Sequence, residues 1–180
     1  IDRWEVQLER DCLRVLALHQ PVASDLRRIA VVLRINNDLE RMADLARHIA
    51  KRVKKLTGAP EPRALPEELE SMATEALAQV RDSLDALVKS DADLARRVIG
   101  GDRQIDRHHR LVRNGLKTAI RNDPDRLNNR LRLINTARNL ERIADHATNI
   151  AEAVIYLKEG ELVRHSPRTR GNDASVKNPH

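Results

Sequence analysis

Hydrophobic positions recur every three or four residues along most of the chain, which is the spacing of one face of an α-helix. The pattern predicts five helices, at about 1–19, 22–56, 66–89, 92–121 and 125–158. In the second of these the steps alternate between three and four, as in helices that pack into bundles. That seam consists of Val32, Ile35, Leu39, Met42, Ala46, Ile49, Val53 and Leu56. The chain is therefore predicted to be all-α.

Helix-breaking and helix-capping residues separate these segments. Pro21 follows the first helix, and a run with three prolines and a glycine follows the second. Ser90 or Asp91 is placed to cap the fourth helix, and Gly160 to end the fifth. The predicted organisation is an N-terminal unit at 1–57, a linker at 58–65, a C-terminal unit at 66–160 and a disordered tail at 161–180.

The chain contains an internal repeat. Residues 39–50 read LERMADLARHIA and residues 140–151 read LERIADHATNIA, an offset of 101. Each half holds a helix, a proline-marked turn and a long helix, and the second half has a further helix in front. We therefore expect an N-terminal segment of one or two helices to be absent from this chain. The uncovered faces of the first two helices should then form an apolar patch.

Composition excludes several protein classes. Aromatic residues are 1% of the chain and there are only 6 glycines, which argues against an all-β fold. No apolar run reaches the roughly 18 residues that a membrane span needs. The single cysteine, Cys12, excludes an intramolecular disulfide and a cysteine-based zinc cluster. With no secretory leader at its start, the chain is expected to be cytoplasmic.

The net charge of +6 permits an acidic partner, yet basic and acidic residues alternate along the predicted helices. Lysine and arginine do not cluster on a recognisable reading helix, and aromatic side chains for base stacking are missing. A basic nucleic-acid-binding helical module is retained as an alternative.

Three pairs of carboxylates stand four residues apart, so that each pair shares a helix face. With Leu39 and Met42 on the seam, the first pair points to the outside of the bundle. One interpretation is a surface site for a hard cation such as Mg²⁺, Mn²⁺, Ca²⁺ or iron, since all the donors are oxygens. The other is solvated carboxylates paired with Arg41 or Arg142. The pairs are Glu40 with Asp44, Asp102 with Asp106, and Glu141 with Asp145.

The histidines do not strengthen a catalytic interpretation. None stands at the Glu-x-x-His spacing of ferritin-like metal sites. Motifs for a phosphate-binding loop, a nucleophile elbow or a zinc protease are also missing from the sequence. A carboxylate-bridged metal enzyme would also need buried ligands, and it is retained as a second alternative.

Five segments, in order, resemble the PhoU family of bacterial phosphate-transport regulators, and together the resemblance covers about 1–165. They are QPVASDLRRI at 20–29, NDLERMAD at 37–44, DADLARRVIGGDRQID at 91–106, RNLERIADHATNIAE at 138–152 and EGELVRH at 159–165. The resemblance implies two similar three-helix bundles, the first lacking its first helix and the start of its second. It also implies a homodimer.

Some members of that family bind iron on the outer bundle surface through these acidic motifs, and others are metal-free. The resemblance therefore implies two sets of surface metal ligands. The C-terminal set is Asp102, Asp106, Glu141 and Asp145. The N-terminal set is Asp2, Glu40 and Asp44, and it is incomplete because the partner of Asp2 is missing.

The function that the resemblance implies is regulation and not catalysis. Members of the family couple a phosphate ABC transporter, through its PstB-like ATPase, to a PhoR-like sensor histidine kinase. They repress the phosphate-starvation response when phosphate is plentiful.

Overall fold

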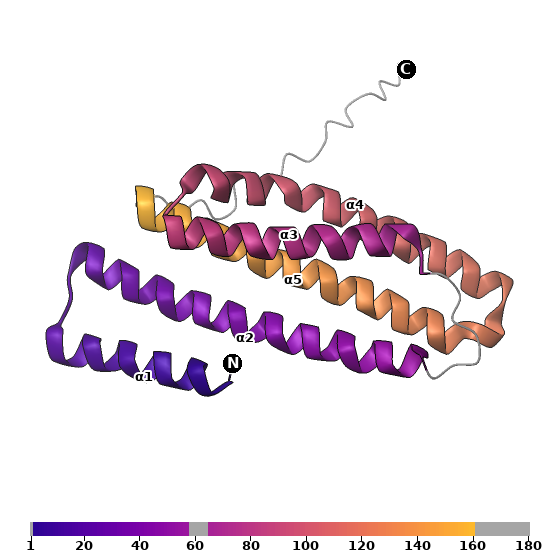
Figure 1. Cartoon of the computed structure of the whole chain (residues 1–180), viewed down its shortest axis with the longest axis horizontal. Helices are drawn as coiled ribbons and strands as arrows, with labels where there is room; N and C mark the ends of the chain where they lie inside the picture. Colours follow the sequence, from indigo (N-terminus) through magenta and orange to yellow (C-terminus); the bar gives the residue numbers. More distant parts are fainter. Residues whose placement is uncertain (1, 58–64, 161–180) are drawn as a thin grey trace, which may run out of the picture.

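The computed structural model describes residues 2–57 and 65–160, and within these ranges it contains helices and no strand (Figure 1). The predicted all-α class is confirmed, and each predicted helix boundary lies within two residues of the observed one. The predicted linker, apart from Leu65, and the predicted tail lie outside the described residues. The elements are α1 (Asp2–His19), α2 (Ala23–Thr57), α3 (Glu67–Lys89), α4 (Ala92–Asn122), the 3₁₀ turn η1 (Pro124–Arg126) and α5 (Leu127–Glu159).

The predicted capping residues end and begin helices as expected. The Asp91 side chain accepts hydrogen bonds from the backbone N–H groups of Asp93 (3.0 Å) and Leu94 (2.9 Å), which would otherwise have no partner in the first turn of α4. Gly160 ends α5 with a φ of +76°, and its N–H donates to the Tyr156 carbonyl (3.0 Å). Local sequence therefore sets these two helix ends.

Helices α3, α4 and α5 form a three-helix bundle with an aliphatic core (Figure 1). The buried stripe of α5 is rich in alanine, which lets its two neighbours approach closely. One core cluster includes Met72, Ile105, Val112 and Ala144, and another includes Ala86, Val98, Val154 and Ile155. This bundle is the rigid support for the side chains discussed below.

Helix α2 lies antiparallel along α5, so the two halves of the repeat share a core (Figure 1). An ion pair between Arg34 Nη2 and Glu152 Oε2 (3.4 Å) joins the two helices. The buried residues at this contact come from both halves. They are Val31, Ile35 and Met42 of α2 with Ile150 and Ala153 of α5.

The predicted seam of α2 is wrong at several positions. Val32, Ala46 and Val53 are exposed. The stripe that faces the core is instead Val31, Ile35, Asp38, Met42 and Leu45. At three positions the covered face lies one residue before the predicted one, at 31, 38 and 45 in place of 32, 39 and 46. One of these positions is Asp38, which a search for apolar residues does not select.

Helix α1 packs against α2 and, among the described helices, against no other. Its hydrophobic side chains are largely exposed, with Trp4 at 79%, and the turn that follows leaves Val22 at 75%. Leu13 and Leu18 are exposed as well. Exposed hydrophobic side chains therefore lie along α1 and in the turn that follows it, and the apolar patch expected on the first two helices stays a prediction.

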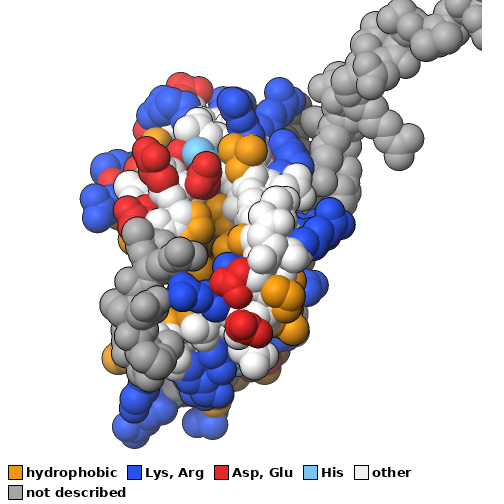
Figure 2. Space-filling model, turned by 90° about the vertical axis from the view of Figure 1, so that its right-hand side faces the viewer, with side chains coloured by type: hydrophobic (Ala, Val, Ile, Leu, Met, Phe, Trp, Pro, Cys, Tyr) orange, Lys and Arg blue, Asp and Glu red, His pale blue; other side chains and the backbone are white. Residues whose placement is uncertain are grey.

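Charged side chains of both signs cover the end of the molecule at which α2 finishes. Lysine and arginine side chains gather around the edge of this end, with aspartate and glutamate side chains set among them (Figure 2).

None of the described helices has the length and apolar composition needed to span a membrane.

Candidate functional site

Helices α4 and α5 bring the C-terminal carboxylates close together. Asp102 and Asp106 lie one turn apart on α4, and Glu141 and Asp145 lie one turn apart on α5. Partial burial raises the pKa of Glu141 above its ordinary value, and the negative charges of Asp106 and then Asp102 raise it further. Two pairs that are separated by 35 residues or more in the sequence are thus electrostatic neighbours in the fold.

These carboxylates line the outside of the bundle. The Glu141 side chain is 27% exposed, Asp102 and Asp106 are half-buried, and Asp145 is exposed. Ile105, between the two α4 carboxylates in sequence, points into the core instead. The outward surface of α4 and α5 that carries these four carboxylates, named the carboxylate groove below, therefore presents negative charge to solvent on the side away from the buried stripe.

A histidine that the sequence analysis did not select lies in this cluster. His109 Nδ1 is 3.8 Å from Glu141 Oε1. Burial lowers the pKa of His109 and the charge of Arg113 lowers it further, while Asp106 and Asp145 act in the opposite direction. The net effect favours the neutral form of the imidazole. The sequence could have indicated His109 through its spacing of three residues from Asp106, but a search limited to Glu-x-x-His does not find an aspartate at that spacing.

We tested whether the cluster suits a metal ion. Several carboxylate oxygens and a neutral imidazole are suitable donors for Mn²⁺ or iron, and the mutual repulsion that raises the Glu141 pKa is what a cation would relieve. Among the described residues, however, no three His, Cys, Asp or Glu side chains lie in an arrangement that could hold a metal ion as they stand. The chemistry of the donors fits a hard cation, and their present positions do not form a metal centre.

The N-terminal carboxylates have arginine partners. Glu40 Oε2 is 3.7 Å from Arg41 Nε, and Asp44 forms an ion pair with Arg47 one turn further on. Both carboxylates are half-buried on α2. The side chain of Asp2 lies outside the described residues. For Glu40, the alternative of a carboxylate paired with Arg41 matches the geometry.

A buried polar contact joins α2 to α5 and was not predicted. Asp38, at 5% exposure, has its Oδ1 2.7 Å from His146 Nδ1 and accepts a further hydrogen bond from Asn149 Nδ2 (3.3 Å). The repeat offset places Asn139 and Leu45 at the positions that correspond to Asp38 and His146, and both are buried. This departure from the repeat was the signal in the sequence, since only the first half carries the acid and only the second half carries the histidine.

Comparison with known proteins identifies relatives along most of the chain. The family model described as the PhoU domain matches residues 1–53 and 69–154. A Pseudomonas aeruginosa protein named phosphate-specific transport system accessory protein PhoU homolog is 39% identical over 170 residues, which are 94% of this chain and 70% of the relative. A protein of the same name from Pseudomonas putida is 41% identical over 165 residues, 92% of this chain and 64% of the relative.

Solved structures agree with the sequence relatives. The crystal structure of PhoU from Pseudomonas aeruginosa superposes with a TM-score of 0.83 at 39% identity, over 89% of this chain and 79% of that one. The crystal structure of the phosphate transport system regulatory protein PhoU from Streptococcus pneumoniae gives a TM-score of 0.80 at 31% identity, over 90% and 75%.

Proposed function

This chain belongs to the PhoU family, and we propose that it is a regulatory adaptor of phosphate uptake and phosphate-starvation signalling. In this proposal it couples the ATPase of a phosphate ABC transporter to a sensor histidine kinase and represses the starvation response when phosphate is plentiful. We also propose that the chain acts in the cytoplasm as a homodimer and has no catalytic activity. The observation that carries the proposal is the match to relatives that are named accessory and regulatory proteins of phosphate transport.

The carboxylate groove between α4 and α5 is the docking surface that we propose for these partners. Its charges stand on two long helices of a packed bundle, which holds them in fixed relative positions. A fixed negative surface accelerates the encounter with a basic partner and disfavours an acidic one, because complementary charge steers association. An adaptor needs both properties, since it must find its partners and reject others.

The position of the carboxylates favours regulation over catalysis. A carboxylate-bridged metal enzyme in a helical bundle holds its ligands inside the bundle, projecting inward from facing helices. Here Glu141 and its neighbours face outward and are half-exposed or exposed. Such a surface can bind ions or proteins without excluding water.

We further propose that Asp102, Asp106, Glu141 and Asp145 take up a hard cation, iron or Mn²⁺, Mg²⁺ or Ca²⁺, on this surface. Support comes from the carboxylates that α4 and α5 bring together, since the pKa of Glu141 is raised first by burial and then by the negative charges of Asp106 and Asp102. Small shifts of the exposed side chains would have to gather the donors. For the N-terminal set of Asp2, Glu40 and Asp44, a cation would first have to displace the arginine partners of the last two.

Affinity purification from phosphate-replete and phosphate-starved cells tests the adaptor role. We expect the transporter ATPase and the sensor kinase to co-purify with the chain from replete cells. The variant Glu141→Lys/Asp145→Lys reverses two charges of the groove and should lose both partners. Glu68→Lys/Glu70→Lys makes the same change in charge at exposed positions of α3 and should retain them.

Circular dichroism melts of both variants will separate lost binding from lost folding. Recovery of neither partner with the unmodified chain would contradict the proposed function. Equal recovery with the two double variants would contradict the assignment of the groove as the docking surface.

A further inference from the structure

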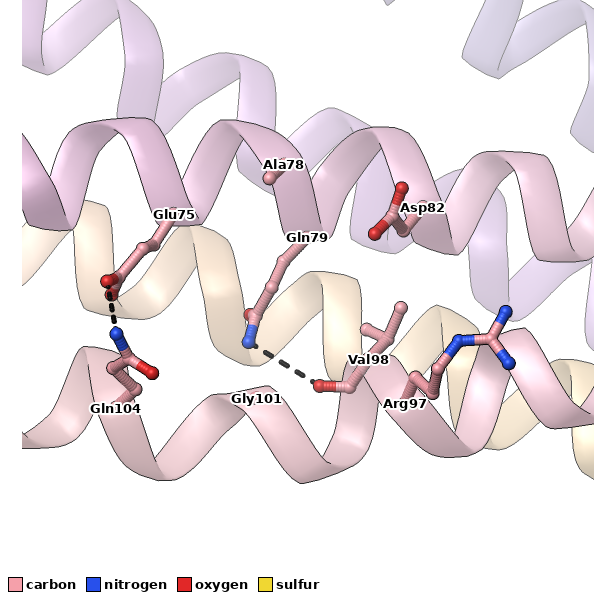
Figure 3. A pocket seen from close by; sticks show the side chains of 8 residues that line it. All are labelled: Glu75, Ala78, Gln79, Asp82, Arg97, Val98, Gly101 and Gln104. Atoms are coloured by element: carbon pink, nitrogen blue, oxygen red, sulfur yellow. Dashed lines mark hydrogen bonds between the residues drawn. The ribbon is translucent and has the colours of Figure 1, made fainter.

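A hollow of about 260 Å³ lies between α3 and α4, on a different face of α4 from the carboxylate groove (Figure 3). Glu75, Gln79 and Asp82 border it from α3, and Gly101 and Gln104 border it from α4. The residues on α3 are four and three positions apart, so they lie in a row along one face of that helix. The proposed regulatory role does not involve this hollow, although its α4 wall belongs to the segment 91–106 that resembles the PhoU family.

Two residues that line the hollow each hold an almost wholly covered oxygen atom that has no hydrogen-bond partner among the described residues. Gln79 is 8% exposed, and its Nε2 donates to the Val98 carbonyl (3.4 Å) while its Oε1 is left unpaired. Glu75 Oε1 accepts from Gln104 Nε2 (2.7 Å) and lies 3.3 Å from His108 Nε2, while Glu75 Oε2 is left unpaired. Since buried polar atoms are almost always satisfied, these two acceptors indicate a missing donor.

A glycine in the middle of α4 gives the Gln79 amide its room. A Cβ atom at position 101 would lie 3.0 Å from Gln79 Nε2, closer than ordinary van der Waals contact. Glycine is among the least favourable residues in a helix interior, so its presence here has a cost that the close approach of the amide explains. The backbone of α4 at Gly101 and the side chain of Val98 supply an uncharged wall.

The charges around the hollow favour a cation. Glu75 and Asp82 contribute two negative charges, and Arg97, on the Asp82 side of the hollow, contributes one positive charge (Figure 3). Seven residues of α-helix separate the two carboxylates by about 10 Å along the axis. The row on α3 therefore has a carboxylate at each end, Glu75 and Asp82, with the Gln79 amide between them.

We propose that this hollow binds a small aliphatic diamine or polyamine. The Glu75 and Gln79 side chains rotate toward the hollow, and one ammonium group donates hydrogen bonds to Glu75 Oε2 and Gln79 Oε1, which are almost wholly covered before the amine binds. The hydrocarbon chain lies along Val98 and Gly101, and the second ammonium group reaches toward Asp82. The volume of about 260 Å³ suits a short alkyl chain and greatly exceeds what a bare metal ion would fill.

Titration calorimetry on the 180-residue protein at constant ionic strength tests the proposal. The probes are 1,4-diaminobutane and spermidine, with 1,4-butanediol as the uncharged analogue and magnesium chloride as the inorganic cation. We expect saturable binding of the diamine or of spermidine and no binding of the diol. Two-dimensional NMR should place the largest shifts at the Gln79 side-chain amide and the Gly101 backbone amide.

Two variants and one control assign the binding to this hollow. Glu75→Gln removes the charge while keeping an oxygen for Gln104, and it should weaken binding at least tenfold, as expected for the loss of a charged hydrogen bond. Gly101→Ala narrows the hollow and should weaken binding to a similar extent. Glu70→Gln removes a charge from an exposed position of α3 away from the hollow and should leave affinity within twofold.

Melting curves establish that each variant is folded. The proposal is overturned by the absence of saturable amine binding, by unchanged affinity in both hollow variants, or by binding of Mg²⁺ in place of the amines. The first of these results would leave ordered water as the donor to Glu75 and Gln79.

Discussion

The buried contact between Asp38 and His146 provides the strongest test of how the two halves are held together. His146→Leu removes the imidazole that lies 2.7 Å from the carboxylate and leaves Asn149 Nδ2, at 3.3 Å, as the remaining donor. Asp38 is 5% exposed, so water cannot readily replace the lost partner. We predict a large loss of stability, because an incompletely paired charge stays buried between α2 and α5.

The expected magnitudes follow from the burial of the pair. Removing one partner of a buried pair costs about 3–5 kcal/mol. For a chain of this size each kcal/mol lowers the melting temperature by about 2–4 °C, so His146→Leu should lower it by roughly 6–20 °C. Asp38→Asn keeps hydrogen-bonding atoms beside the histidine and should cost only about 0.5–1.5 kcal/mol.

The double variant Asp38→Asn/His146→Leu is the matched control. In the repeat, Asp38 corresponds to Asn139 and His146 corresponds to Leu45, and both of these residues are buried. The double variant therefore places at this contact the residue types that the other half already buries. With no carboxylate left to bury, it should be more stable than His146→Leu by about 2 kcal/mol or more.

Urea unfolding of the four proteins at pH 7, followed by circular dichroism, gives the coupling energy between the two positions. The reasoning is refuted if His146→Leu costs less than about 1 kcal/mol, or if the two single changes add without coupling.

Three further predictions concern the carboxylate groove and the end of α5. Glu141→Gln should raise the free energy of unfolding at pH 7 by roughly 0.4–1 kcal/mol, the scale of two like-charge pairs. Because the folded-state pKa of Glu141 is raised, ionising this carboxyl destabilises the folded state, and the loss of stability grows as the pH rises from the ordinary pKa of 4.5 to the folded pKa. The stability gained by Glu141→Gln should therefore vanish in urea titrations near pH 4 and below. If the groove takes up a cation, iron, Mn²⁺ or Mg²⁺ at about 100 times its dissociation constant should raise stability by roughly 2.7 kcal/mol, and Asp145→Asn should abolish the gain in thermal melts; equal gains in both proteins would place the metal elsewhere. Gly160→Ala should cost about 1–2 kcal/mol in urea unfolding, since φ is +76° and the new Cβ would lie 2.9 Å from Arg27 Nη1; an unchanged stability would show that the end of α5 is not constrained.

The sequence by itself determined the helices, their ends and the faces that their residues share. Periodicity, capping and turn residues act within a few positions of the chain, so Gly160 could be assigned, and the cap of α4 narrowed to Ser90 or Asp91, without any tertiary information. The repeat and the one-turn spacing of Glu141 and Asp145 likewise follow from counting residues. The resemblance to PhoU rested on the same local segments.

Only the tertiary structure decided which neighbour covers each face. Periodicity states that residues lie on one side of a helix, but not which helix packs there, so the covered face of α2 was misplaced by one residue at Asp38. His109 and Gln79 were overlooked for a related reason. Each is a polar residue that gains its role from a side chain on another helix, Glu141 for the first, or from close approach to a neighbouring backbone, Gly101 for the second. Such contacts depend on distances between segments far apart in the chain, and a one-dimensional pattern holds no record of them.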